Sequence, residues 1–173
     1  MDTNFFTMNY CGIILAKSES QRLPNKNFLD LGDKLVYQYA YNALDDICDV
    51  FVFGDRFSNR PPAASISDEP IFSALKWAYK SLPRRYDAII NIMANCPQHT
   101  AEGVRKAIER FEALGCDELR SFSENGQESG LMILKEGYLL KKHEISTYQA
   151  AITLESKEIH DLNDFNECKT LLS

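Results

Sequence analysis

A chain of 173 residues has the length of one compact domain, because domains run to roughly 100–200 residues each. Hydrophobic residues make up 45% of it, which is enough to build a buried core without disulfides or a structural metal. Its 19 Lys and Arg against 25 Asp and Glu give a net charge of -6, which argues against a general nucleic-acid binder or a protein held on an anionic membrane. Any phosphate that it binds must therefore be met by a local cluster of cations.

Two further features of the sequence bear on where in the cell the protein is found. No segment approaches the ~20 apolar residues of a membrane span, and no signal-peptide pattern opens the chain. The five cysteines include no C-x-x-C pair, which is typical of reduced thiols packed in a core. We therefore expect a cytoplasmic protein with no membrane or nucleic-acid partner. We expect 1–173 to form one domain, with 1–9 as a loose N-terminal extension.

Short apolar β-type runs alternate with longer helical patterns, which predicts a layered α/β domain. In chain order, the N-terminal half is predicted to contain a strand over 11–16, a helix over 34–44, a strand over 49–54, a helix over 71–81 and a strand over 88–93. A helix over 101–114 follows, with Thr100 as its N-cap and Gly115 as its C-terminal stop. The remaining predicted elements are strands over 119–122 and 131–134, a short helix over 138–142, a strand over 148–154 and a final helix over 163–172.

The order of these elements predicts the fold. Strand, helix and strand recur at least twice near the N-terminus, which favours a mainly parallel sheet with right-handed crossovers. The expected fold class is therefore α/β, a three-layer α/β/α sandwich with a Rossmann-like sheet. Because ligands bind at the carboxyl ends of such strands, we expect a site where the loops after Ala16, Gly54 and Met93 meet.

The loop after the first strand carries the strongest chemical signal. From Ala16 it reads A-K-S-E-S-Q-R-L-P-N-K-N, with the cations Lys17, Arg22 and Lys26 inside ten residues. Cations together with backbone N–H donors are what a bound polyphosphate requires. A solvated connector accounts for the same composition, because the segment is not a Walker loop and lacks the glycines of a dinucleotide-binding loop.

This loop resembles the signature A-R-x-x-S-x-R-[LI]-P-x-K-N of the sugar-acid cytidylyltransferases, the CMP-acylneuraminate synthetase family. The matching positions are Ala16, Ser20, Arg22, Leu23, Pro24, Lys26 and Asn27. Weaker similarity continues in the same order through D-V-F-V-F-G-D, D-A-I-I-N-I-M-A-N-C-P-Q-H-T and E-I-H-D-L-N-D-F, and so spans 10–172. The resemblance implies a fold of the nucleotide-diphospho-sugar transferase type. It also implies transfer of CMP from CTP, with Mg²⁺, to an acidic sugar of the nonulosonate type, with release of pyrophosphate.

The resemblance further implies roles for individual residues. Lys17, Arg22 and Lys26 are expected to bind the β- and γ-phosphates and so to act in catalysis. The nucleotide is expected to contact Ala16, Ser18, Ser20, Asn27 and Asp55. The sugar is expected to contact Asn95 and His99, and the metal ion Glu158 and Asp161. The expected partners are thus CTP or another nucleoside triphosphate and an acidic sugar. A homodimer stays open, because the region in which the family carries dimer-forming segments is short here.

Structural roles that involve no ligand are alternatives for several of these residues. Asn27 suits a hydrogen bond to its own loop backbone, and Asp55 suits a loop or helix-cap carboxylate. His99 suits an ordinary loop histidine. Near the C-terminus, Asn163 or Asp164 is the expected cap of the last helix, which leaves Asp161 for the metal.

Five positions depart from the family pattern. Lys17 stands in place of an Arg, and so keeps the charge but loses the planar fork. Glu19 adds a negative charge, and Met93 replaces a Gln that is an expected sugar contact. Glu158 and His160 replace two Asp residues that usually hold magnesium, and an imidazole is a poor ligand for this ion. Two alternatives therefore stay open: a relative that binds nucleotide or sugar phosphate without turnover, and a nucleotidyltransferase with a different nucleotide and sugar.

Overall fold

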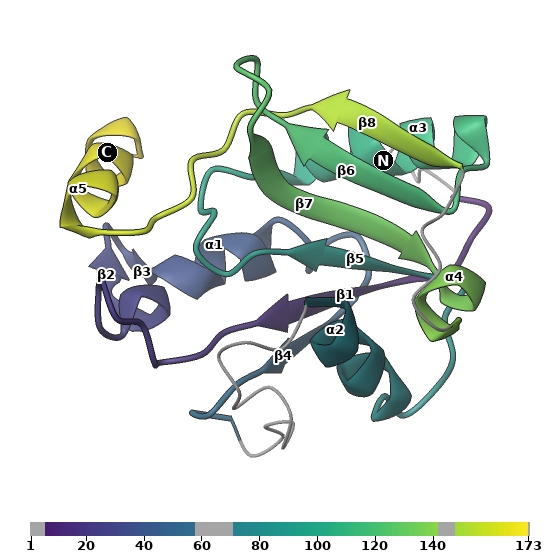
Figure 1. Cartoon of the computed structure of the whole chain (residues 1–173), viewed down its shortest axis with the longest axis horizontal. Coiled ribbons are helices and arrows are strands. Elements are labelled where there is room, and N and C mark those ends of the chain that lie inside the picture. The colour runs from purple at the N-terminus through teal and green to yellow at the C-terminus, as the bar shows by residue number, and fades with distance from the viewer. Residues whose placement is uncertain (1–5, 58–70, 142–147, 173) are drawn as a thin grey trace.

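The computed structural model describes residues 6–57, 71–141 and 148–172, with a six-stranded sheet at the centre (Figure 1). Across the sheet the strands follow the order β4-β1-β5-β7-β6-β8. Their bounds in chain order are β1 Tyr10–Leu15, β4 Asp49–Phe53, β5 Ala88–Ile92, β6 Glu118–Phe122, β7 Glu128–Lys135 and β8 Gln149–Thr153. Of these six strands only β7 runs against the others, so the predicted mainly parallel sheet is confirmed.

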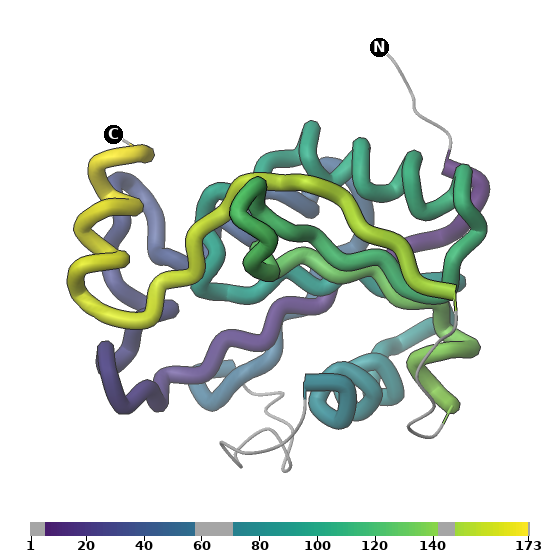
Figure 2. The backbone as a smooth tube through the Cα atoms, turned by 45° about the horizontal axis from the view of Figure 1, so that its top comes forward, coloured from purple at the N-terminus to yellow at the C-terminus, as the bar shows by residue number. Residues whose placement is uncertain are grey.

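Helices cover both faces of this sheet and give the three layers that the sequence predicts. The pair on one face is α1 (Val36–Asn42) and α3 (Ala101–Leu114), and the pair on the other is α2 (Ile71–Lys80) and α4 (Glu136–Leu140). Figure 2 shows α3 and α2 on opposite sides of the sheet. Each face buries its own apolar core, since Phe111 of α3 packs in one cluster and Leu75 of α2 in the other.

The helix α3 has the bounds that its sequence predicts. The Thr100 side chain accepts a hydrogen bond from the Gly103 backbone N–H at 3.2 Å, which caps the first turn. Gly115 ends the helix in the left-handed conformation, with φ 64°. Between these caps the buried positions recur at helical spacing: Val104, Ala107, Ile108 and Phe111.

A small layer of short elements follows the carboxyl end of β1. The elements are the 3-10 turn η1 (Lys26–Phe28) and the two strands β2 (Asp30–Leu31) and β3 (Lys34–Leu35), which pair antiparallel. The C-terminal helix α5 (Leu162–Leu171) packs here, with Phe165 and Cys168 against Leu31 and Val36 (Figure 1). The helix predicted to start at Lys34 therefore starts two residues later, because Lys34 and Leu35 pair with β2 instead.

The other predicted elements are present with shifted ends. The strand predicted over 131–134 extends to Glu128–Lys135, and the helix predicted over 138–142 begins at Glu136. Residue 142 lies outside the described residues, as do 1–5. Residues 6–9, part of the predicted loose extension, are held to the domain: Asn9 N donates to Asp87 Oδ2 at 2.7 Å and Met8 N to Glu112 Oε1 at 3.1 Å. No described helix is both long and apolar enough to cross a bilayer.

Candidate functional site

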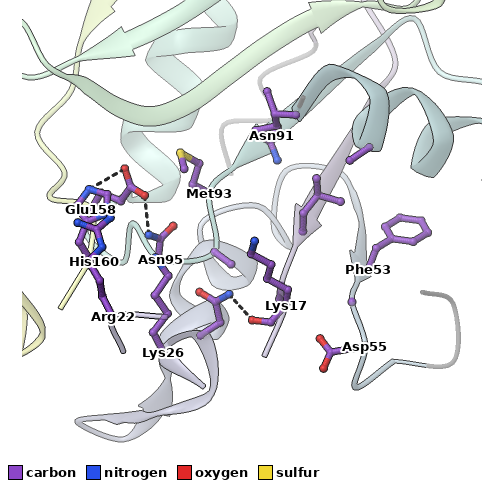
Figure 3. A pocket seen from close by; sticks show the side chains of 17 residues that line it. Lys17, Arg22, Lys26, Phe53, Asp55, Asn91, Met93, Asn95, Glu158 and His160 are labelled. Carbon is purple, nitrogen blue, oxygen red and sulfur yellow. Dashed lines mark hydrogen bonds and ion pairs between the residues drawn. The ribbon is translucent and has the colours of Figure 1, made fainter. Parts of the chain in front are cut away.

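A cavity of about 380 Å³ lies at the carboxyl ends of β1, β4 and β5 (Figure 3). The loops that follow these three strands form its walls, together with the first turn of α2 and the segment around Glu158 and His160. The sequence predicts a site at this rim, and most of the predicted residues line the cavity. They are Ala16, Lys17, Arg22, Lys26, Asn27, Asp55, Asn95 and Glu158.

Three cations, Lys17, Arg22 and Lys26, share this cavity. Lys26 is half-buried, and its Nζ donates to the carbonyl oxygen of Ile159 at 2.9 Å. Burial lowers the pKa of Lys26, while the nearby Glu158 carboxylate opposes that shift. Within the described part of the chain, nothing pairs with the ammonium of Lys17. The cavity therefore presents positive charge to any ligand that enters it, and anions bind best at such a place.

The loop after β1 is shaped by asparagines. Asn25 adopts the left-handed conformation at φ 59°, which Asn tolerates better than most residues, and its N–H donates to the Ser18 carbonyl at 3.0 Å. The Asn27 side chain donates from Nδ2 to the Lys17 carbonyl at 2.9 Å. The loop is thus folded back on itself, and this fold brings Lys17 and Lys26 to the same cavity. Asn27 has the local backbone bond expected of a plain loop residue and also lines the cavity.

Asp55 organises the other side of this loop. Its Oδ1 accepts a hydrogen bond from Ser18 N at 2.7 Å, and its Oδ2 accepts a hydrogen bond from Ser18 Oγ. Asp55 therefore ties the loop after β4 to the loop after β1 while lining the cavity. Ser18 itself acts through Asp55, and neither Ser18 nor Ser20 belongs to the cavity wall.

Three segments that are far apart in the chain meet at Ile159. Its carbonyl oxygen accepts from Lys26 Nζ at 2.9 Å and from Asn95 Nδ2 at 3.0 Å, and its N–H donates to the Asn95 carbonyl at 2.9 Å. The loop after β1, the loop after β5 and the segment before α5 are therefore joined around one backbone unit. This junction closes the side of the cavity that carries Glu158 and His160.

A polar chain crosses this junction from Arg22 to Asn95 (Figure 3). Arg22 Nη2 lies 3.0 Å from His160 Nδ1. Because a guanidinium only donates, Nδ1 is the acceptor and the ring proton is on Nε2, which lies 3.3 Å from Glu158 Oε2. Glu158 Oε1 in turn accepts from Asn95 Nδ2 at 2.9 Å. Sequence reasoning treated His160 only as a poor metal ligand and missed that it orients Arg22 and Glu158.

The two residues predicted to bind metal are not brought together as ligands. Asp161 is the N-cap of α5, since its Oδ1 accepts from the backbone N–H of Asn163 at 2.9 Å and of Asp164 at 3.1 Å. The expectation that Asn163 or Asp164 caps this helix is therefore wrong; Asp164 completes a capping box instead. Glu158 keeps its place on the cavity wall. No cluster of three or more His, Cys, Asp or Glu suited to a metal ion occurs in the described ranges.

His99 is not brought to the cavity. Its side chain is 7% exposed, and Nε2 lies 2.6 Å from the Ser129 carbonyl oxygen, to which it donates. Burial lowers the pKa of His99 below its ordinary value. The expected contact with the sugar therefore finds no support in this geometry; the local sequence carries a loop proline and polar residues, and these do not reveal the burial.

The buried imidazole predicts a pH effect on stability. Below about pH 6.5 the unfolded chain protonates His99 while the folded chain does not, so stability should fall as pH falls toward the folded pKa. The loss should approach ~1.4 kcal/mol per pH unit within that window. We expect urea unfolding of wild type and His99→Gln, followed from pH 7.5 to 5.5, to show a shallower decline for the variant. Parallel declines would contradict the assignment.

Asn91 is a further polar residue of the cavity that sequence reasoning missed. It lies inside β5, in the run A-I-I-N-I, and only 1% of its surface is exposed. A lone amide in an otherwise apolar buried strand is itself a signal, because burying one without hydrogen bonds is costly. The apolar wall beside it includes Phe53, Ile71 and Ala74.

Comparison with known proteins agrees with this geometry. A family model described as Cytidylyltransferase matches residues 11–57, which span β1, the loop with the three cations and β4. A search of curated proteins found no match. The matched residues carry much of the cavity wall, including Lys17, Arg22 and Lys26.

Solved structures resemble the whole described fold. A CMP:2-keto-3-deoxy-manno-octonic acid synthetase complexed with CTP superposes with a TM-score of 0.74 at 12% identity, covering 95% of this chain and 98% of that chain. A cytidylyltransferase from Leptospira borgpetersenii gives a TM-score of 0.71 at 14% identity, covering 94% and 86%. Rv0371C from Mycobacterium tuberculosis H37Rv, in complex with manganese, gives 0.57 at 14% identity, covering 94% and 98%. At these identities the likeness shows the fold alone, and it confirms the predicted α/β fold of the nucleotidyltransferase type.

Proposed function

We propose that this protein is a nucleotidyltransferase that transfers CMP from CTP to an acidic sugar and releases pyrophosphate. The observation that carries the proposal is the convergence of Lys17, Arg22 and Lys26 on one cavity at the carboxyl ends of β1, β4 and β5. A cavity of this size suits a nucleotide, and ligands of open α/β sheets bind at this edge. The net charge of the chain is negative, so a bound triphosphate needs a local cluster of cations, and these three residues form one.

The three cations have a clear role in such a reaction. A sugar hydroxyl attacks the α-phosphorus in line and releases its proton to water. The bond from that phosphorus to the bridging oxygen breaks, and pyrophosphate leaves with the electron pair. Little covalent work falls to the protein, so alignment and neutralisation of charge on the leaving group dominate. Lys17, Arg22 and Lys26 bind the β- and γ-phosphates in this proposal. Asn27, which also lines the cavity, contacts the nucleoside part.

A divalent metal ion fits this cavity through one carboxylate. Magnesium is commonly held by one or two carboxylates together with substrate phosphates and water. Glu158 on the wall would supply one such carboxylate by exchanging a contact with Asn95 or His160 for the ion. Asp161 does not line the cavity, and its Oδ1 caps α5. The ion supplies charge neutralisation on the triphosphate when bound. The manganese complex of one structural neighbour is consistent with a divalent ion here.

The choice of nucleotide and sugar class rests on the family signature. The Cytidylyltransferase model covers the loop that carries the three cations, and one structural neighbour is a CMP-sugar-acid synthetase complexed with CTP. Both support a cytidine nucleotide, and the neighbour supports an acidic sugar. The nonulosonate class follows from the resemblance of 16–27 to the CMP-acylneuraminate synthetase signature.

A second function, nucleotide binding without turnover, is favoured by one observation. Arg22 is engaged with His160, and Lys26 with the Ile159 carbonyl, so two of the three cations already have protein partners. Cations that already contact protein groups still bind a triphosphate, but they stabilise the charge that builds up on the leaving pyrophosphate less well.

Pyrophosphate release tests both functions. We expect release with CTP, magnesium and an acidic sugar such as N-acetylneuraminate or 3-deoxy-manno-octulosonate, and none with UTP, ATP or GTP. Removal of the metal with EDTA should abolish the signal, and added magnesium should restore it. Binding of CTP in a calorimeter without release for any sugar acid supports the second function, and absence of binding by any triphosphate contradicts both.

A further inference from the structure

The two amide atoms of Asn91 have unequal environments. Nδ2 donates to the carbonyl oxygen of Ile13 in β1 at 2.8 Å. Because a carbonyl only accepts, the amino group must face β1, and this turns Oδ1 away from that strand. Oδ1 has no hydrogen-bond partner within the described part of the chain, although Asn91 is only 1% exposed. Buried polar atoms in native proteins nearly always have a partner, so this acceptor needs a donor from elsewhere.

Asn91 lies where two cavities meet. It lines the cavity with the three cations and also a neighbouring cavity of about 50 Å³, which Ile71 and Met93 line as well. The second cavity extends toward Arg120 of β6 and Gly130 of β7. Figure 3 shows Asn91 and Met93 on one side of the main cavity, with Phe53 and Asp55 across from them.

Two other polar residues of the smaller cavity, Arg120 and Ser121, have hydrogen-bond partners within the protein. Arg120 Nε donates to Glu118 and its Nη1 donates to Glu128 Oε1 at 2.7 Å. Ser121 Oγ accepts from Leu131 N at 2.9 Å. Among the described residues that line the two cavities, Asn27 and Asn91 each have a buried side-chain oxygen without a partner, and of these two Asn91 is the one that also borders the smaller cavity.

We infer that Asn91 is a specificity-determining residue whose Oδ1 accepts a hydrogen bond from a hydroxyl of the sugar substrate at the junction of the two cavities. The inference rests on the proposed function. In that reaction pyrophosphate leaves on the side of Lys17, Arg22 and Lys26, and in-line attack brings the sugar to the α-phosphorus from the opposite side. Asn91 belongs to β5, and the smaller cavity that it borders is lined further by residues of β6 and β7, which carry none of the three cations. A polyhydroxylated ligand supplies the O–H donors that Oδ1 lacks.

Calorimetric titration of the full chain tests the assignment. Wild type and Asn91→Leu are first titrated with α,β-methylene CTP, which does not react, and then with N-acetylneuraminate or 3-deoxy-manno-octulosonate. We expect nucleotide affinity to change less than about twofold, while the sugar binds about 10- to 100-fold more weakly, because one buried hydrogen bond to the ligand is lost. A sugar analogue without the contacted hydroxyl should bind wild type and variant equally.

Ser156→Ala is the matched control. Ser156 is also a buried polar residue, at 8% exposure, and lines neither of the two cavities. Both affinities should stay at their wild-type values in this variant. Should Asn91→Leu fail to fold, the side-chain amide resonance of Asn91 in ¹⁵N-labelled wild type gives the answer. It should shift when the sugar is added to the nucleotide complex and stay in place when the nucleotide alone is added.

The remaining outcomes overturn the inference. An unchanged sugar affinity in Asn91→Leu removes Asn91 from the sugar site. Loss of the preference for CTP over UTP, with sugar affinity kept, assigns the donor to the amino group of the base instead. A wild type that binds the nucleotide and neither sugar overturns the inference while the nucleotide half of the proposed function stands. A wild type that binds no triphosphate overturns both, and this is seen at the first titration.

Discussion

Replacement of Lys26 by alanine is expected to weaken CTP binding and turnover together by about 100-fold or more, since loss of one well-placed charge in such a site typically costs about 3–4 kcal/mol. Lys26 is the most enclosed of the three cations, and burial already lowers its pKa. An ammonium that is partly stripped of water gains more from a phosphate than an exposed one does. Titration calorimetry with CTP and a pyrophosphate-release assay measure the two effects.

The loss of CTP affinity in Lys26→Ala can be separated from any loss of stability. Lys26 also holds the Ile159 carbonyl, so thermal unfolding of Lys26→Ala and of Lys26→Met shows how much of the loss comes from that contact. Lys106→Ala is the matched control, because Lys106 is exposed on α3, pairs with Glu102 on the surface and does not line the cavity. Water screens that exposed pair, and CTP binding should not respond to its loss. Equal CTP affinity in Lys26→Ala and Lys106→Ala would remove Lys26 from the site.

Replacement of Gly54 by alanine is expected to lower the free energy of unfolding by about 3 kcal/mol and to weaken CTP binding as well. A Cβ at this position would lie 1.8 Å from the carbonyl oxygen of Ala16. Ala16 N also donates to the Phe53 carbonyl at 2.7 Å, so the exits of β1 and β4 touch through their backbones. A side chain there forces apart the two loops that carry Lys17 and Asp55.

Gly137→Ala gives the comparison for this change. Gly137 lies in α4, and a Cβ there meets nothing within 4 Å. Alanine in a helix is favoured over glycine by up to about 1 kcal/mol, so this variant should unfold at the same or a higher urea concentration than wild type. If the unfolding midpoints of Gly54→Ala and Gly137→Ala agree, the backbone contact between the two loops is not tight.

Elements with a full periodic pattern and caps were predictable from the sequence. The helix α3 has the predicted bounds because Thr100, Gly115 and four apolar positions at helical spacing all specify the same segment. The two-residue strands β2 and β3 were not predicted, since two residues carry no periodicity. Leu31 of β2 packs against α5, which lies far away in sequence.

The site was predictable where its residues are neighbours in the chain. Lys17, Arg22 and Lys26 lie in one loop, and a β-strand ahead of that loop indicates the rim on which they gather. The contact from Arg22 to His160 joins residues separated by 138 positions, and no spacing rule reveals it. Asp161 was predicted as a metal ligand and Asn163 or Asp164 as the cap, whereas the structure uses Asp161 as the cap, with Asp164 completing the capping box.

The junction at Ile159 has a consequence for how the protein is made. During synthesis the loop after β1 emerges early, while the segment that closes the cavity is translated more than 130 residues later. Until that segment docks, Lys26 and Asn95 face water without the carbonyl that they share in the folded chain. The nascent chain therefore cannot complete its binding pocket on the ribosome before residue 159 has left the exit tunnel.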